Sequence, residues 1–361
     1  MKVDVQYQVS PYLLFFIIYA SQVGVGILSF QRGIAAEAGY DAWISVILAG
    51  CLAQILMLVM YKLVSKAKGD IVMIQRNIFG KYFGGFFNLF IMLYYGLASI
   101  SVLRSYIEIV QVWMFPTLPT WCLSIILVII SYHIISGGFR VVVGVCFFSV
   151  IFPFVSLITL YFFPLKYAHI DNLLPVLDHT PKEILSGIKS SIYTMAGFEV
   201  LLMVYPFIGN RKSPQKYAHL GLLATTLLYT LSAIITFLFF SEEQLTMTIW
   251  PALNMTKVIH FSFLERFEYI YISVYMITIL ALISLLLWSS SRGIKLIFQV
   301  KQKYPLLLLC LINVIGCQLL SDRSLITKYQ EFISQINIWI FYVYIPILFL
   351  LFTVFEKRAN Q

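Results

Sequence analysis

Ten long apolar segments restrict what this chain can fold into more than any other feature of its sequence. A helix that crosses a bilayer needs about 20 mostly apolar residues. Only 11% of the 361 residues are charged, against about a quarter in a soluble domain, which argues against a soluble enzyme and a nucleic-acid-binding protein. The sequence therefore predicts an all-α, multi-pass membrane protein with spans at about 11–30, 42–64, 83–112, 119–136, 141–163, 182–208, 218–240, 269–290, 305–320 and 336–355.

The placement of lysine and arginine predicts how the chain is oriented. If the N-terminus lies inside, roughly two-thirds of the basic residues fall on the cytoplasmic side, as the positive-inside rule requires. We therefore expect both termini in the cytoplasm. The outer loops carry helix signals, because Thr180-Pro181-Lys182-Glu183 matches a capping box and Ser241 precedes two glutamates.

Two of the predicted spans contain a break. Gly24-Val25-Gly26 interrupts the first span, and Ala196-Gly197-Phe198-Glu199 interrupts the sixth. Close helix packing through small residues is one explanation for the glycines, but a G-x-G spacing places them on different helix faces. Breaks at corresponding positions of two halves favour a transporter-type binding site in an inverted repeat. We expect one domain over 1–361, with repeats at about 11–163 and 182–355.

A pair of broken helices favours a particular kind of ligand. The N-terminal ends of half-helices present free N–H groups to a carboxylate, while unwound carbonyl groups face an ammonium group or a cation. A zwitterionic amino acid matches both polarities. A sugar would normally require several Asn, Gln or Trp side chains inside the membrane, and the spans contain few of them.

The charged residues inside the spans are candidates for function. Glu199 lies near the middle of span six, where it could be a proton site, a partner for an ammonium group or an anchor for unwound backbone; a protonated structural acid is the alternative. Arg104 and Glu108 are four residues apart in span three and could form an ion pair in a vestibule or at the membrane interface. The histidines and cysteines show no metal-ligand spacing, and no enzyme motif has a suitable context, so we expect no metal, cofactor or catalysis.

Several motifs resemble those of the spore germination permeases, the B subunits of endospore germinant receptors in the amino acid–polyamine–organocation superfamily. The similarity extends over essentially the whole chain, and its last two motifs are specific in combination. It is carried by Gly24-Val25-Gly26-Ile27-Leu28, Gly197-Phe198-Glu199-Val200, Asn172-Leu173-Leu174-Pro175-Val176-Leu177, Thr248-Ile249-Trp250-Pro251 and Leu264-Glu265-Arg266-Phe267-Glu268.

This resemblance implies ten helices in a five-plus-five inverted repeat, residence in the spore inner membrane or cell membrane, and assembly with a larger membrane subunit and a lipoprotein subunit. It also implies that a small germinant binds where helices one, three, six and eight meet. The matching positions in this chain are Gly24, Gly26, Ile27, Ala98, Ala196, Gly197, Phe198, Leu282 and Leu286. Such a pocket is apolar apart from its backbone groups, which favours a hydrophobic amino acid.

Three functions remain open at this point. The first is a germinant-sensing subunit that binds a small nutrient and signals to its partner subunits with little or no flux. The second is an amino-acid permease that is coupled to protons through Glu199, and the third is a scaffold without a working pocket. The resemblance favours the first.

Overall fold

The computed structural model describes residues 3–209, 214–259 and 266–359. These residues are almost entirely helical, and their one β-type contact is an isolated parallel bridge between Val9 and Ile208. Some residues used in the arguments from charge and motifs lie outside the described residues, namely Lys2, Arg211, Lys212, Leu264 and Glu265. The α-helices are α1 Leu13–Gln22, α2 Phe30–Ala38, α3 Ala42–Ala67, α4 Ile71–Trp113, α5 Thr120–Ser136, α6 Phe139–Phe162, α7 Pro181–Thr194, α8 Leu201–Val204, α9 Pro214–Phe239, α10 Glu242–Met247, α11 Pro251–Met255, α12 Phe267–Phe298, α13 Lys303–Leu319, α14 Arg323–Asn337 and α15 Ile345–Ala359.

The lengths and composition of these helices are those of a multi-pass membrane protein. Within the described residues, six helices are long and apolar enough to cross a membrane, and the bent pair formed by α7 and the segment Phe198–Phe207 makes a seventh. Three shorter apolar helices, α1, α5 and α13, coincide with the remaining predicted spans. The predicted all-α membrane fold is therefore confirmed.

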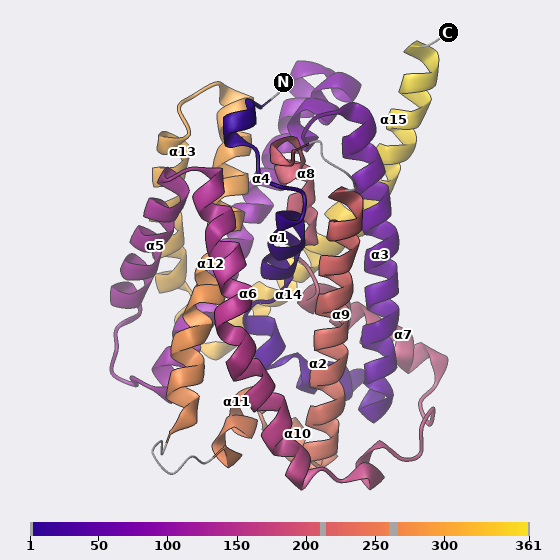
Figure 1. Ribbon diagram of the computed structural model, residues 1–361, viewed down its shortest axis with the longest axis vertical. Helices are drawn as coiled ribbons and strands as arrows, with labels where there is room; N and C mark the ends of the chain where they lie inside the picture. The colour runs from indigo at the N-terminus through magenta and orange to yellow at the C-terminus, as the bar shows by residue number, and fades with distance from the viewer. Residues whose placement is uncertain (1–2, 210–213, 260–265, 360–361) are drawn as a thin grey trace.

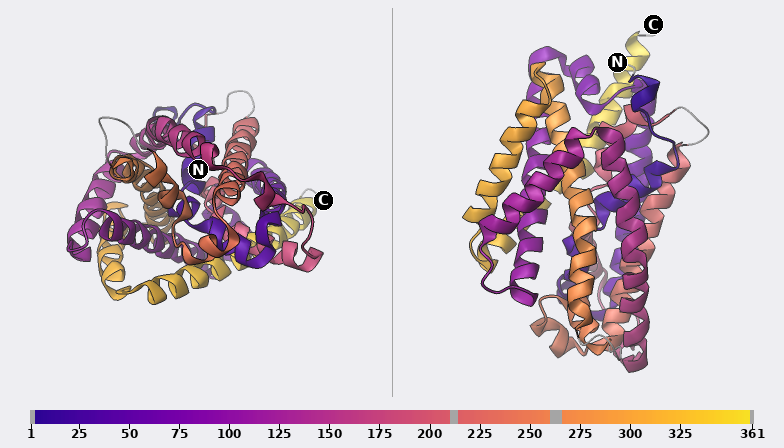
Figure 2. Two further views of the ribbon diagram at one scale, coloured as in Figure 1. Left: turned by 90° about the horizontal axis from the view of Figure 1, so that it is seen from below. Right: turned by 60° about the vertical axis from the view of Figure 1, so that its left-hand side comes forward.

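The helices form one elongated bundle with α12 at its centre. α12 packs along α4 and α6 and is largely buried, while α5 and α13 cover one flank and α3 and α9 pack together on the other (Figures 1 and 2). Both ends of the described chain lie at the same end of the bundle, and α10 and α11 lie at the opposite end (Figure 1). This placement agrees with an even number of membrane crossings.

Local sequence signals explain where several helices begin. Thr180 and Glu183 form a reciprocal capping box at the start of α7, and Ser241 and Gln244 form another at the start of α10, so both predicted caps are confirmed. Asp70 caps α4 by accepting a hydrogen bond from the Met73 N–H group at 3.0 Å.

Three span boundaries differ from the predicted ones. The first span continues through α2 to Ala38, and the eighth continues to Phe298 instead of 290. The predicted start of the third span is kept, because the chain folds back at Gly80, where φ is +76°, and the Asn88 side-chain amide donates to the Val72 carbonyl at 3.1 Å. The tenth span begins at Arg323 instead of 336 and includes a π-helical turn, Ile338–Tyr344, between α14 and α15. Hydropathy missed α14 because this helix is amphipathic and carries three charged side chains, Arg323, Lys328 and Glu331.

Candidate ligand cavity between two broken helices

The first span is unwound at Gly24, close to the middle of the bundle. α1 ends at Gln22, and a short 3₁₀-helix, Val25–Leu28, precedes α2. Two carbonyl groups at the break accept hydrogen bonds from tyrosines: Tyr229 donates to Gln22 O at 3.0 Å, and Tyr275 donates to Gly24 O at 2.7 Å. The first N–H groups of the 3₁₀-helix have no carbonyl group within that helix to bond, so they can serve a ligand.

The sixth span is unwound at Gly197 and lies against the first break. α7 ends at Thr194, and the chain resumes as a 3₁₀-helix at Phe198 after a bend of 51°. Gln22 donates from its side chain to Met195 O at 2.7 Å, which joins the two breaks directly. Gly197 has φ of +119°, and a Cβ atom at this position would collide with the carbonyl oxygen of Ser21. Only glycine fits this close backbone approach.

Glu199 holds the second break in place. Its carboxylate is buried, and its oxygens accept hydrogen bonds from the Gly197 N–H group at 2.7 Å, the Tyr94 hydroxyl at 2.9 Å and the Asn337 amide at 3.0 Å. Tyr95 donates to the Glu199 carbonyl at 3.0 Å. The side chain thereby connects unwound backbone to α4 and to the end of α14, which is the geometry of the backbone anchor among the roles considered for this acid.

A cavity of about 520 Å³ lies between the two breaks. Most of the residues singled out in the sequence line it, namely Gly24, Gly26, Ala98, Ala196, Gly197, Glu199, Leu282 and Leu286. Ile27 and Phe198 do not line it, because both side chains are buried in the hydrophobic core. The glycines leave backbone accessible at the base of the cavity, while Ala98, Leu282 and Leu286 supply apolar surface.

The outer walls of the cavity are more polar than the sequence indicated. Hydroxyl and amide side chains of α4, α7 and α14 line them, and Lys189, Glu37 and Glu331 also face the cavity. The expectation of an apolar pocket therefore holds only in part, although further apolar side chains join Ala98 and α12 in the lining, namely Val25, Phe30, Ile34, Val102, Ile333 and Ile338. Assigning residues 323–335 to a loop concealed the contribution of α14, and for the polar residues inside predicted spans the sequence does not show which side chains face a cavity. The polar residues that sequence reasoning missed are Ser21, Gln22, Ser29, Tyr94, Ser101, Ser105, Ser186, Ser190, Tyr193, Thr194, Thr327, Gln330, Ser334 and Gln335.

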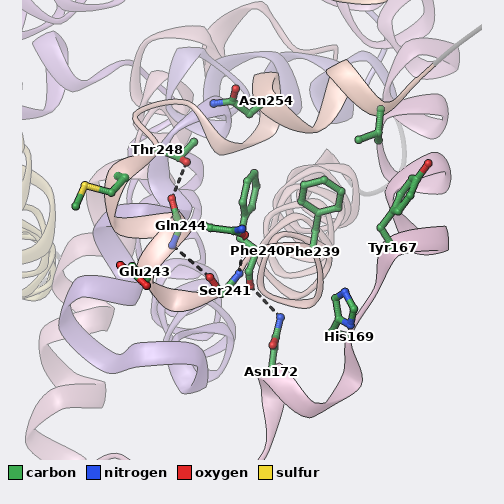
Figure 3. Close-up of a pocket in the computed structure, with 12 residues that line it drawn as sticks. Tyr167, His169, Asn172, Phe239, Phe240, Ser241, Glu243, Gln244, Thr248 and Asn254 are labelled. Atoms are coloured by element: carbon green, nitrogen blue, oxygen red, sulfur yellow. Dashed lines mark hydrogen bonds between the residues drawn. The ribbon is translucent and has the colours of Figure 1, made fainter.

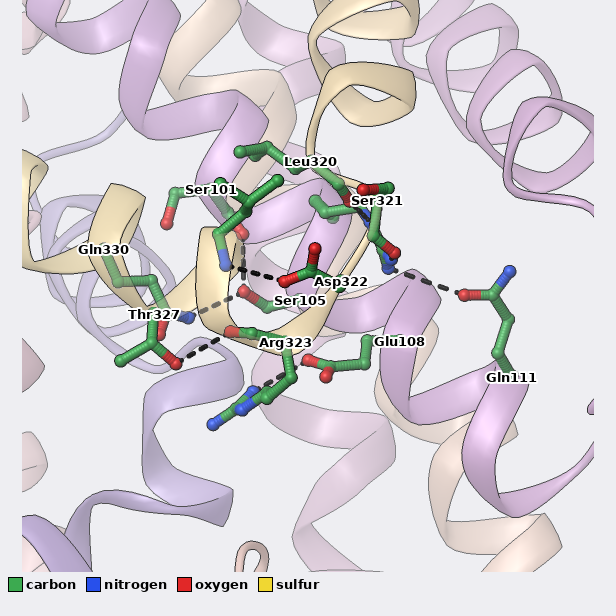
Figure 4. A network of polar contacts seen from close by, with 12 residues as sticks. Ser101, Ser105, Glu108, Gln111, Leu320, Ser321, Asp322, Arg323, Thr327 and Gln330 are labelled. Atoms are coloured by element: carbon green, nitrogen blue, oxygen red, sulfur yellow. Dashed lines mark hydrogen bonds and ion pairs between the residues drawn. The ribbon is translucent and has the colours of Figure 1, made fainter.

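Arg104 and Glu108 have different partners from those expected. Arg104 donates to the carbonyl groups of Leu320 at 2.7 Å and Ser321 at 3.2 Å. Glu108 instead accepts from Arg323 at 2.7 Å (Figure 4). The Arg323 guanidinium also lies 5.5 Å from the centre of the Trp250 ring. The pairing predicted within α4 is replaced by contacts between α4, the start of α14 and the segment before α11, because α14 begins earlier than expected.

Replacing Arg323 with methionine tests this connection. We expect a loss of about 1–3 kcal/mol in the free energy of unfolding, because the largely buried Glu108 carboxylate would lose its charged partner. Thermal unfolding of the purified chain measures the loss. Arg32→Met, at an exposed position of α2, serves as the control, and equal unfolding temperatures for Arg323→Met and the wild type would contradict this role.

A second hollow of about 880 Å³ lies at the end of the bundle that carries α10 and α11 (Figure 3). Its polar groups largely serve local structure: Asn172 donates to the carbonyl groups of Phe237 and Phe240 at the end of α9, and Ser241 and Gln244 form the capping box of α10. Unlike the cavity between the breaks, this hollow is built around loops and helix ends.

Comparison with known proteins identifies the family. A family model described as "Spore germination protein" matches residues 8–326. The chain belongs to the spore germination protein family. Among curated members, it is 42% identical to the spore germination protein GerQB of Bacillus cereus over 352 residues, covering 98% of each chain. It is 24% identical to the spore germination protein YndE of Bacillus subtilis (strain 168), covering 96% of each chain.

Solved structures show that this germination protein shares its fold with transporters. A substrate-bound, outward-open Na⁺-coupled sialic acid symporter matches with a TM-score of 0.70 at 10% identity, covering 96% of this chain and 79% of the symporter. MhsT in complex with L-phenylalanine matches with a TM-score of 0.63 at 15% identity, covering 97% of this chain and 89% of MhsT. At these identities the likeness concerns the fold alone. Membership of the family connects the chain to spore germination, and its apolar helices are those of a multi-pass membrane protein.

Proposed function

We propose that this protein is the nutrient-sensing membrane subunit of a spore germinant receptor, and that it binds a small nutrient, an amino acid, in the cavity between the broken helices. The observation that carries the proposal is the contact between the two breaks. Gly24 and Gly197 bring unwound backbone from both halves of the chain to one cavity. The first N–H groups of the 3₁₀-helix after Gly24 suit a carboxylate, and carbonyl groups of unwound backbone are the type of group that suits an ammonium group.

Further features support an amino acid. Ala98, Leu282 and Leu286 supply an apolar surface for a side chain beside the backbone groups. MhsT, which shares the fold, is solved in complex with L-phenylalanine. In the proposed assembly, both termini lie in the cytoplasm, the bilayer is the spore inner membrane, and the partners are a larger membrane subunit and a lipoprotein subunit.

The alternative of a proton-coupled permease receives less support from the surroundings of Glu199. Its two carboxylate oxygens already accept hydrogen bonds from backbone, tyrosine and amide donors. A carboxylate held by three donors favours a fixed structural role over one that gains and loses a proton in every transport cycle.

Replacing Gly24 with valine tests the proposal in spores. Gly24 has an extended backbone conformation that any residue can adopt, and an added Cβ atom would lie 2.7 Å from Leu282 Cδ2, the mobile end of a side chain. We therefore expect the chain to fold while valine fills the base of the cavity, so that the spores lose their response to amino acids. The germination rate is measured for each amino acid, with immunoblots of the membrane fraction to verify chain levels.

Gly144→Ala is the matched control for this experiment, because a Cβ atom at Gly144 meets nothing within 4 Å and Gly144 lies away from the cavity. An unchanged amino-acid response in Gly24→Val spores would favour the scaffold without a working pocket.

A further inference from the structure

A π-helical turn divides the tenth span beside the cavity. It comprises Ile338–Tyr344 and joins α14 to α15. π-Helical turns are rare and occur frequently at functional sites. Their presence in a packed span implies that neighbouring groups stabilise the unusual register.

Asn337, the last residue before the π-turn, is attached to the anchor of the sixth span. Its side-chain amide donates to Glu199 Oε1 at 3.0 Å and to the Tyr94 hydroxyl at 2.6 Å, and all three side chains are buried. The position of the π-turn is therefore tied to the break at Gly197, because Glu199 also accepts from the Gly197 N–H group.

The helix that precedes the π-turn forms one wall of the cavity. Thr327, Gln330 and Ser334 of α14 line it, and Gln330 also donates to the Ser105 hydroxyl of α4 at 2.8 Å. A molecule that fills the cavity therefore touches α14 a few residues before Asn337. Displacement of this wall acts directly on the hydrogen bonds that Asn337 makes.

The polar groups around the π-turn are incompletely paired. Within the described part of the chain, Asn337 Oδ1, Tyr342 OH and Gln75 Oε1 are buried without a hydrogen-bond partner, although Gln75 Nε2 donates to the Tyr344 hydroxyl at 2.9 Å. Buried polar atoms in native proteins are usually paired, so these unpaired atoms are groups that a change of register could supply with partners. An alternative register changes the neighbours of all three atoms.

The helix that follows the π-turn carries any change to the far end of the bundle. α15 extends to the end where the chain termini lie, and its Glu356 pairs with Lys66 of α3 at 3.5 Å (Figure 1). The most apolar stretch of the span Arg323–Glu356 also has the smallest buried share among those of the six long apolar helices of the described residues, so less protein packs against it than against the other spans. Converting one π-turn to α-helix rotates the following helix by about 100°.

We propose that the π-turn Ile338–Tyr344 is a two-register joint that links occupancy of the cavity to the position of α15, with Asn337 as the positioning residue. Filling the cavity displaces α14, releases Asn337 from Glu199 and Tyr94, and converts the π-turn to α-helix. The rotated α15 then presents a different face to its surroundings at the end of the bundle that carries the termini.

Hydrogen–deuterium exchange tests this proposal without any assumption about the nutrient. The native cysteines of the full chain are first replaced by serine, and the protein is reconstituted in nanodiscs. A single cysteine is then introduced as Thr194→Cys, at a half-buried position of the cavity wall, and is modified with benzyl methanethiosulfonate so that a benzyl group fills the cavity. Ser190→Cys is a second attachment site, and mass spectrometry verifies complete modification. We expect exchange of the amides of residues 338–344 to slow by at least about threefold, because the proposed α-helical register would be continuous with α14 and α15 and would open locally less often than the joint.

Two asparagine variants show whether Asn337 makes the connection. In Asn337→Leu, exchange at residues 338–344 is expected to be the same with and without the benzyl group. Asn313→Leu, which removes another buried asparagine from the adjacent α13, is expected to keep the response. Unchanged exchange at 338–344 after complete modification at either attachment site, or a full response in Asn337→Leu, would overturn the proposal. Neither result depends on whether the protein senses an amino acid.

Discussion

Alanine in place of Gly197 is expected to prevent the chain from reaching its native structure. The backbone at this position has φ of +119°, and the added Cβ atom would collide with the carbonyl oxygen of Ser21, which belongs to backbone and cannot rotate away. Backbone strain of about 1–3 kcal/mol and overpacking of about 1–3 kcal/mol add up to a loss of about 2–6 kcal/mol in the free energy of unfolding. The yield of folded protein and its unfolding temperature measure this loss.

Gly85→Ala is the control for Gly197→Ala. Gly85 is also a glycine within a span, but a Cβ atom there meets nothing within 4 Å, so alanine is expected to be neutral or slightly stabilising. Wild-type stability of Gly197→Ala would mean that the two breaks do not touch as described, and the basis of the cavity would be lost.

Glutamine in place of Glu199 is expected to have the second-largest effect. Both carboxylate oxygens accept hydrogen bonds, one from the Gly197 N–H group and the other from Tyr94 and Asn337. A glutamine side chain has one acceptor oxygen, so its NH₂ group must face a donor on one side. We expect a loss of about 1–3 kcal/mol in the free energy of unfolding, because a buried donor is left without a partner.

The same substitution separates the anchoring role of Glu199 from proton coupling. An acid that only carries protons can be replaced by glutamine with loss of coupled transport but little loss of stability. Thermal unfolding of Glu199→Gln is compared with that of Glu243→Gln, at an exposed position of α10. If both variants unfold at the wild-type temperature, Glu199 does not anchor the sixth span.

The two helix breaks were accessible to prediction because glycine pairs and a mid-membrane acid are rare and carry a direct physical meaning. Gly24-Val25-Gly26 and the stretch around Gly197 appear in the structure as unwound backbone facing one cavity. The capping signals at Thr180 and Ser241 were equally informative, since a cap acts over only four residues. Signals that act over a few neighbouring residues were therefore enough to predict the two helix breaks that line the cavity.

Features that depend on packing between distant segments could not be obtained in this way. The amphipathic sequence of α14 resembles a polar loop in a hydropathy profile, so its contribution to the cavity wall was missed. Arg104 and Glu108 have the spacing of a helical ion pair, yet Glu108 lies closer to Arg323, which is 215 residues further along the chain. Asn337 has no local signal, because its importance comes entirely from its contact with Glu199.

The central claim is that the cavity binds an amino acid, and that the protein senses this amino acid instead of accumulating it. Measuring binding and uptake together tests this claim most directly. The purified full chain is reconstituted into proteoliposomes with an imposed proton gradient and given each radiolabelled amino acid in turn. The account predicts saturable binding of at least one amino acid, loss of that binding in Gly24→Val but not in Gly144→Ala, and no concentrative uptake. Concentrative uptake, or the absence of saturable binding for every amino acid, would contradict it.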